Sequence, residues 1–151
     1  MYFYQAVMAA EVIVFVFRGF AGPLEFFAGL FAAPTELHLL LHLTVFAFFG
    51  RALEEMMGTQ WFAATFIAGA LSGNLLGGVS LFGYSATFAG GAGSGIMALI
   101  GGLVAKRPLT WVVAEYVPVP AFAAAAFFIF VKFILDQSFD AIPLLIGMAF
   151  G

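Results

Sequence analysis

The stretch PTELHLLLHLTVFAFFGR, from Pro34 to Arg51, decides the class of this protein. It is almost wholly apolar, yet it carries both histidines of the chain, His38 and His42. Residues four apart lie on the same face of an α-helix, one turn from each other. Thr35 is a suitable cap for the start of such a helix. The stretch therefore predicts a membrane span that begins after Thr35 and stops at Gly50-Arg51.

The whole chain shares this apolar character. Of its 151 residues, 64% are hydrophobic and 9% are charged, whereas an ordinary soluble domain is about 45–50% apolar and about 25% charged. At about 20 residues per span, the length allows five or six transmembrane helices. We therefore expect an all-α, polytopic membrane helix bundle in one domain, residues 1–151. The few basic residues exclude nucleic-acid binding, and the absence of Cys excludes disulfides and thiolate metal sites.

Charges, prolines and glycines divide the rest of the chain into segments. The first span, about Tyr2 to Phe17, contains one charge, Glu11. The glycine-rich residues 77–95 predict a membrane-embedded loop that dips into the bundle. The last segment, 140–151, is too short to span alone, so it is either a short helix or a helix truncated by the end of the sequence. The other expected segments are a connector at 19–35 and spans at 61–79, 95–105 and 117–135.

The basic residues give a small charge asymmetry across the membrane. Arg51, Lys106 and Arg107 fall on one side of the expected topology, and Arg18 and Lys132 fall on the other. Cytoplasmic loops carry the excess of Lys and Arg, so three against two predicts that both termini face the cytoplasm. We expect an integral, multi-pass protein of the plasma (inner) membrane, with the lipid bilayer as its first partner.

Ionisable residues inside membrane spans are costly and therefore indicate function. His38 and His42 could supply two ligands of a metal site, but zinc needs at least a third, and the nearby acid Glu36 lies on another face. The histidines could instead hydrogen-bond to other helices and order the bundle, or act as donors to an oxyanion. The residues alone leave these alternatives open. We expect no metal ion and no cofactor.

Ser94 lies in a glycine-rich run, Gly90-Gly91-Ala92-Gly93-Ser94-Gly95, directly before an expected span. Backbone N–H groups exposed at a helix start would suit a serine nucleophile with an oxyanion hole. A serine among glycines can also serve packing alone, and the spacing by itself favours packing.

From residue 34 onward, the motifs resemble in order those of the rhomboid family of intramembrane serine proteases. His38-Leu-Leu-Leu-His42, followed by Gly50-Arg-Ala-Leu-Glu54 and then Gly58, is similar to the family's second span. That span reads His-x-x-x-Asn and then Gly-x-x-x-Glu-x-x-x-Gly. Ser72-Gly73 resembles the Ser-Gly turn of the family's third span, and residues 90–101 resemble the Gly-x-Ser-Gly stretch that carries the nucleophile. Residues 117–121 resemble the Pro-rich entry to the fifth span, and Gly147 with Gly151 resemble the glycines of the last helix.

The resemblance implies a six-helix bundle in which a serine on the fourth helix and a histidine on the sixth form a catalytic dyad. Here the nucleophile position is Gly93, and Ser94 stands one residue later. His42 takes the place of the family's asparagine, and counting back from Gly147 puts Leu144 at the position of the base. Loss of the nucleophile or base of such a unit costs about 10⁶ in turnover. We therefore expect a protein that keeps the scaffold without the chemistry.

The resemblance also assigns the remaining roles. His38, His42 and Gly93 would line the cavity or the oxyanion site. Glu54 would be a scaffold acid that accepts hydrogen bonds from neighbouring backbone N–H groups. The glycines with structural roles would be Gly58, Gly73, Gly95 and Gly147.

Three functions follow from these observations. The favoured one is a pseudoprotease that binds the transmembrane segments of client proteins. The alternative is an active intramembrane serine endopeptidase in which Ser94 works with a rearranged base, His42 or His38. A small transporter or channel is disfavoured because the chain has no internal repeat. The sequence does not indicate the oligomeric state.

Overall fold

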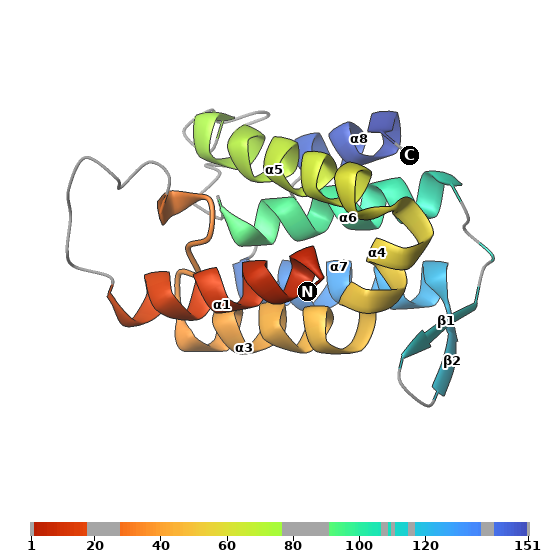
Figure 1. Cartoon of the computed structure of the whole chain (residues 1–151), viewed down its shortest axis with the longest axis horizontal. Coiled ribbons are helices and arrows are strands. Elements are labelled where there is room, and N and C mark those ends of the chain that lie inside the picture. The colour runs from red at the N-terminus through yellow and green to blue at the C-terminus, as the bar shows by residue number, and fades with distance from the viewer. Residues whose placement is uncertain are drawn as a thin grey trace.

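The structure, a computed structural model, describes residues 2–17, 28–76, 91–106, 109, 111–114, 117–136 and 141–150. These residues form a bundle of helices with a short β-hairpin at one end (Figure 1). The predicted helix bundle is confirmed, although the hairpin was not predicted. The helices are α1 (Phe3–Val16), α3 (Glu36–Val45), α4 (Arg51–Met57), α5 (Thr59–Leu76), α6 (Ala92–Lys106), α7 (Ala121–Asp136) and α8 (Ala141–Phe150), with a π-helical segment (Phe46–Gly50) between α3 and α4.

The second span is longer than predicted. Helix α3, the π-helical segment and α4 form one continuous helix, Glu36–Met57, of 22 residues. At 1.5 Å per residue it is about 33 Å long, close to the hydrocarbon core of a bilayer at about 30 Å. Within the described residues, only this helix is both long and apolar enough to cross a membrane, and shorter apolar helices cover Phe3–Val16, Ala92–Lys106 and Phe122–Leu135.

The expected stop at Gly50-Arg51 is therefore wrong. Gly50 does not end the helix but lets α1 pack closely against it. A Cβ on Gly50 would lie 2.7 Å from Cδ2 of Tyr4, so the bare backbone makes room for the Tyr4 ring. The π-helical turn carries the chain through this contact and into α4.

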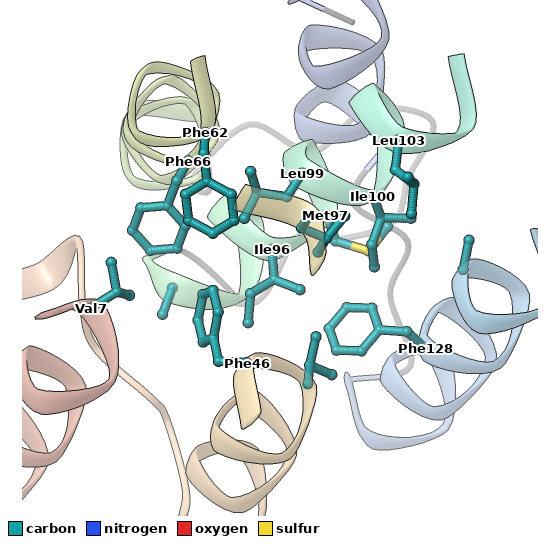
Figure 2. Packing of buried hydrophobic residues seen from close by; sticks show 14 of the residues in the cluster. Val7, Phe46, Phe62, Phe66, Ile96, Met97, Leu99, Ile100, Leu103 and Phe128 are labelled. Carbon is teal, nitrogen blue, oxygen red and sulfur yellow. The ribbon is translucent and has the colours of Figure 1, made fainter. Parts of the chain in front are cut away.

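Helix α6 lies at the centre of the bundle. Its residues from Ala92 to Leu103 are all buried. It packs mainly against α5 and α8, and it also contacts α3 and α7 (Figure 1). The rings of Phe46, Phe62 and Phe66 gather beside Ile96 (Figure 2). A helix with no face that needs water suits this central position.

Glycines allow α6 to approach its neighbours at backbone distance. A Cβ on Gly147 of α8 would collide with the carbonyl oxygen of Ala98, and one on Gly101 would collide with the carbonyl oxygen of Leu144. A Cβ on Gly69 of α5 would collide with the Ala98 side chain. Small residues at helix contacts permit this close packing in lipid. These contacts join α5, α6 and α8 into one side of the bundle.

Helix α6 corresponds to the span predicted at 95–105. It begins earlier than predicted, at Ala92 instead of Gly95. Gly91, directly before it, has a φ of 83°, a left-handed conformation that glycine adopts readily. A Cβ on Gly91 would also collide with the carbonyl oxygen of Gly29. Residues 77–90, most of the expected membrane-embedded loop, lie outside the described residues.

Residues 117–120 form a strand, not the start of the fifth span. Strand β1 (Trp111–Ala114) pairs antiparallel with β2 (Val117–Pro120), with Trp111 opposite Pro120 and Ala114 opposite Val117. Prolines fit a two-stranded ribbon because each strand has one edge that needs no N–H donor. Helix α7 begins only after the hairpin, at Ala121.

The first and last described helices both contact the start of α5. The rings of Phe3 and Phe62 lie 6.2 Å apart, and those of Trp61 and Phe150 lie 6.3 Å apart. The start of α1, the start of α5 and the end of α8 therefore share one end, as Figure 1 also shows. This arrangement places both ends of the described bundle on the same side.

The contact between α6 and α8 predicts a specific sensitivity at Gly147. We expect Gly147→Leu to destabilise the protein by about 1–3 kcal/mol or more, because its side chain has no room beside Ala98. Thermal unfolding in detergent measures the effect. The matched control is Ala149→Leu, on the exposed side of the same helix. Equal melting temperatures for the two variants would contradict the proposed contact.

Candidate functional site

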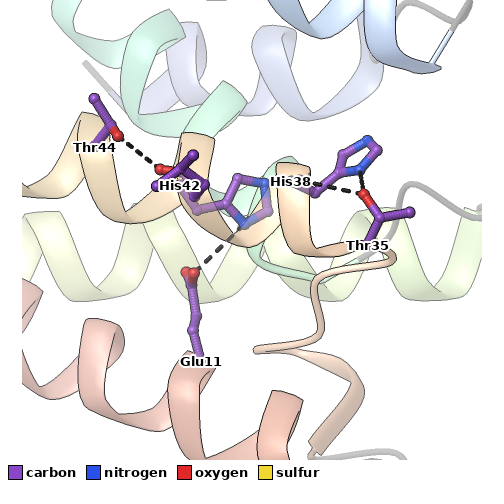
Figure 3. Close-up of polar contacts among 6 residues, drawn as sticks. Glu11, Thr35, His38, His42 and Thr44 are labelled. Carbon is purple, nitrogen blue, oxygen red and sulfur yellow. Dashed lines mark hydrogen bonds and ion pairs between the residues drawn. The ribbon is translucent and has the colours of Figure 1, made fainter.

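A buried acid on α1 faces a buried histidine on α3. Glu11 is 0% exposed and His42 is 2% exposed. The Oε2 atom of Glu11 lies 3.4 Å from Nδ1 of His42, as the dashed line in Figure 3 marks. Within the described residues, neither these atoms nor Oε1 of Glu11 has a partner in good hydrogen-bond geometry. The two side chains therefore face each other as a buried polar pair in an apolar bundle.

The other side of the His42 ring faces α6 at Gly93. A Cβ on Gly93 would lie 3.2 Å from Nε2 of His42 and 3.6 Å from its Cε1. The imidazole therefore bridges the space between Glu11 on α1 and residue 93 on α6. Three separate segments of the chain meet at this point.

Lys132 approaches the same position from α7. The side chain is 4% exposed, and its Cε would lie 3.5 Å from a Cβ on Gly93. Lys132 therefore belongs to the interior of the bundle. The side of the membrane nearer to Lys132 stays a prediction, as does the charge asymmetry, and Arg18 and Arg107 lie outside the described residues.

His38 has different surroundings from His42, although the two lie one turn apart. Its Nδ1 lies 2.7 Å from Oγ1 of Thr35, and its backbone N–H donates to the same oxygen, which caps α3 (Figure 3). The rings of His38 and His42 lie 6.5 Å apart in an edge-to-face arrangement. Of the two histidines, only His42 is among the atoms nearest to residue 93.

Ser94 and Leu144 lie elsewhere around α6. Ser94 is 1% exposed, and successive residues of a helix point about 100° apart, so its side chain leaves α6 in a different direction from residue 93. Leu144, at the expected base position on α8, packs against the hydrophobic core cluster. Among the described residues, no three His, Cys, Asp or Glu side chains group as metal ligands would.

These positions can be compared with known proteins. The model of the rhomboid domain matches residues 23–151, all of the chain except its first 22 residues. The chain belongs to the rhomboid family. It is therefore an integral, multi-pass membrane protein. No curated protein and no solved structure matches it.

The family match does not include α1, which precedes residue 23. Glu11 therefore lies outside the part of the chain that the rhomboid model covers, whereas its partner His42 lies inside it. Sequence reasoning missed the roles of both Glu11 and Lys132. A signal was present, since each is an ionisable residue inside an apolar helix.

Glu54 ties the start of α1 to the end of α4. Its carboxylate accepts hydrogen bonds from the backbone N–H groups of Phe3 at 2.9 Å and Tyr4 at 3.0 Å, and from Oγ1 of Thr59 at 2.9 Å. The first N–H groups of a helix have no partner within the helix, and a negative charge is favourable there. This buried carboxylate in the rhomboid domain therefore caps a helix that lies outside the family match.

The glycines that sequence reasoning singled out have separate surroundings. Gly58 ends α4 with a φ of 82°, in the left-handed region that favours glycine. A Cβ on Gly95 would press on the Phe66 ring, 2.5 Å from Cε2. Gly73 is half-buried on α5, next to Ser72, whose hydroxyl donates to the carbonyl oxygen of Gly69.

The capping of α1 predicts the effect of removing Glu54. We expect Glu54→Ala to lower the free energy of unfolding by about 1–3 kcal/mol, because two backbone N–H groups and a hydroxyl, all part-buried, lose their acceptor. Glu55→Ala is the matched control, since Glu55 is exposed and its contacts with Arg51 and with the Tyr2 hydroxyl lie at the surface, where such pairs contribute little. Thermal unfolding in detergent compares them. An unchanged melting temperature for Glu54→Ala would show that the carboxylate does not hold α1.

Proposed function

We propose that this rhomboid protein is a pseudoprotease that binds transmembrane segments of client proteins. The observation that carries the proposal is the pair of residues at the dyad positions: Gly93 where the nucleophile belongs and Leu144 where the base belongs. Glycine has no side chain to attack a carbonyl, and leucine cannot accept a proton. These losses explain why the scaffold would be kept for binding and not for hydrolysis.

The packing of α8 supports this proposal. Leu144 lies against the core cluster, and its carbonyl oxygen occupies the space beside Gly101 of α6. Because the two helix backbones touch there, α8 cannot rotate another side chain toward residue 93 without separating from α6. A replacement base from α8 is therefore disfavoured by the same contact that holds the bundle together.

Helix α7 is the best candidate for the client-binding side. Its main contacts are with α6 and β2, so most of its surface faces away from the bundle. Phe122, Ala126, Phe130 and Phe133 are exposed and follow the spacing of a single helix face. Phe130 has 62% of its surface exposed. A face with a small residue between aromatic rings would let a client helix approach α7 closely.

The absence of serine chemistry can be tested directly. We expect the wild-type protein in detergent to react with a serine-directed fluorophosphonate probe no faster than Ser94→Ala does. We also expect both proteins to leave a reconstituted transmembrane substrate uncleaved. Labelling or cleavage that depends on Ser94 would overturn the pseudoprotease proposal and favour the endopeptidase that uses Ser94.

Client binding can be tested with a photo-crosslinking residue on α7. We expect a probe at Phe130 to crosslink a synthetic single-span helix that carries a Gly-x-x-x-Gly face, and to crosslink a poly-leucine helix of equal length much less. The matched control is a probe at Ile13, which is similarly exposed on α1. Equal crosslinking from both positions, or to both helices, would mean random lipid-phase encounters and would contradict binding at α7.

A further inference from the structure

Two of the three groups of an acid–base–nucleophile arrangement lie beside residue 93, and the nucleophile is the group that is missing. Glu11 faces Nδ1 of His42 at 3.4 Å, and Nε2 of the same ring lies 3.2 Å from the position of a Cβ on Gly93. A carboxylate, an imidazole and a side chain in this order are the parts of an activated nucleophile: the base takes the proton, and the acid orients the base.

We infer that Glu11 and His42 form an oriented general-base pair directed at residue 93, so that the site lacks a nucleophile but not a base. This inference does not depend on client binding. It differs from the dyad that the rhomboid resemblance implies, because the base lies on α3 and its orienting acid lies on α1, outside the family match. In it, Glu11 is a positioning residue that acts through His42.

The neighbours of the two ring nitrogens indicate which nitrogen of His42 carries the proton. When Glu11 is ionised, its carboxylate can only accept a hydrogen bond, so the Nδ1 side of His42 then carries the proton that faces Glu11. The Nε2 atom then presents a lone pair toward residue 93 and can accept a proton from a hydroxyl or thiol there. Hydrogen bonds of catalytic groups are often long before a ligand is bound, so the 3.4 Å separation fits this role.

Other polar groups lie near residue 93, and each is a rival to His42 as the base that faces this residue. Lys132 of α7 approaches residue 93 through its Cε, His38 lies edge-to-face with His42, and Ser94 follows on α6. Of the three heavy atoms nearest to a Cβ on Gly93, two belong to the His42 ring and the closest is its Nε2, whereas Lys132 contributes Cε. This proximity favours His42 over Lys132 as the base.

The chain has no cysteine, so Gly93→Cys gives a protein with a single thiol as a reporter. An isolated thiol is only a few per cent thiolate at pH 7, whereas a thiol paired with histidine is largely thiolate. We expect the ultraviolet absorbance of the purified G93C protein to show mainly thiolate at neutral pH. The matched control is Ser94→Cys, equally buried and one residue along α6, which we expect to stay a thiol.

Second substitutions identify the group responsible. We expect His42→Gln to remove most of the thiolate from G93C, Glu11→Leu to reduce it, and Lys132→Met to leave most of it. A thiolate fraction in G93C no higher than in S94C would overturn the inference. So would a thiolate that persists with His42→Gln and disappears with Lys132→Met.

A measurement on the wild-type protein keeps the inference testable if G93C does not fold. The chain has two histidines, so nitrogen NMR of labelled histidine gives two pairs of ring signals, which His38→Asn assigns. We expect His42 to carry its proton on Nδ1, and Glu11→Leu to abolish that preference. A proton on Nε2 in the wild type, or a preference unaffected by Glu11→Leu, would contradict the orienting role of Glu11.

Discussion

Backbone contact between α6 and α8 sets the geometry of the rest of the bundle. The carbonyl oxygens of Ala98 and Leu144 occupy the spaces where Gly147 and Gly101 would otherwise carry side chains. In a bilayer, lipid tails are as apolar as leucine, so helices gain their association from close van der Waals packing. With α5 and α8 against one side of α6, the other side faces α3 and α7 (Figure 1). The first turn of α6 is thereby brought against the polar side chains of His42 and Lys132.

The polar residues of the interior are few, and their positions follow from that packing. A buried acid without a partner would be expensive in an apolar bundle, and Glu11 lies where His42 is within reach. Glu54, at the end of α4, accepts the first N–H groups of α1 and so fixes the height of α1 along the bundle. The two carboxylates therefore act together: Glu54 holds the start of α1 in place, and Glu11, on α1, reaches His42. This coupling gives α1 a role in a site otherwise built from the rhomboid domain.

Local sequence predicted the helix bundle well because membrane spans are set by runs of apolar residues and by their ends. It was less accurate where distant residues decide the local structure. Gly50 and Arg51 suggest a helix end, but the helix continues because Gly50 accommodates the Tyr4 ring. Val117–Pro120 suggests a helix start, but these residues pair with Trp111–Ala114. The resemblance implied a structural role for Gly147, and this glycine lies at the contact between α6 and α8.

The sequence by itself determined the membrane environment and the order of the rhomboid motifs, and it has glycine at residue 93 and leucine at residue 144, from which we predict the loss of the usual dyad. These properties depend on the identity of residues at single positions. Tertiary structure decided which polar residues meet. Glu11 and His42 are 31 positions apart in the sequence, and Lys132 lies on a third helix, so no local spacing connects them. Their meeting depends on how α1, α3 and α7 pack around α6, because only that packing sets which face of each helix is turned inward.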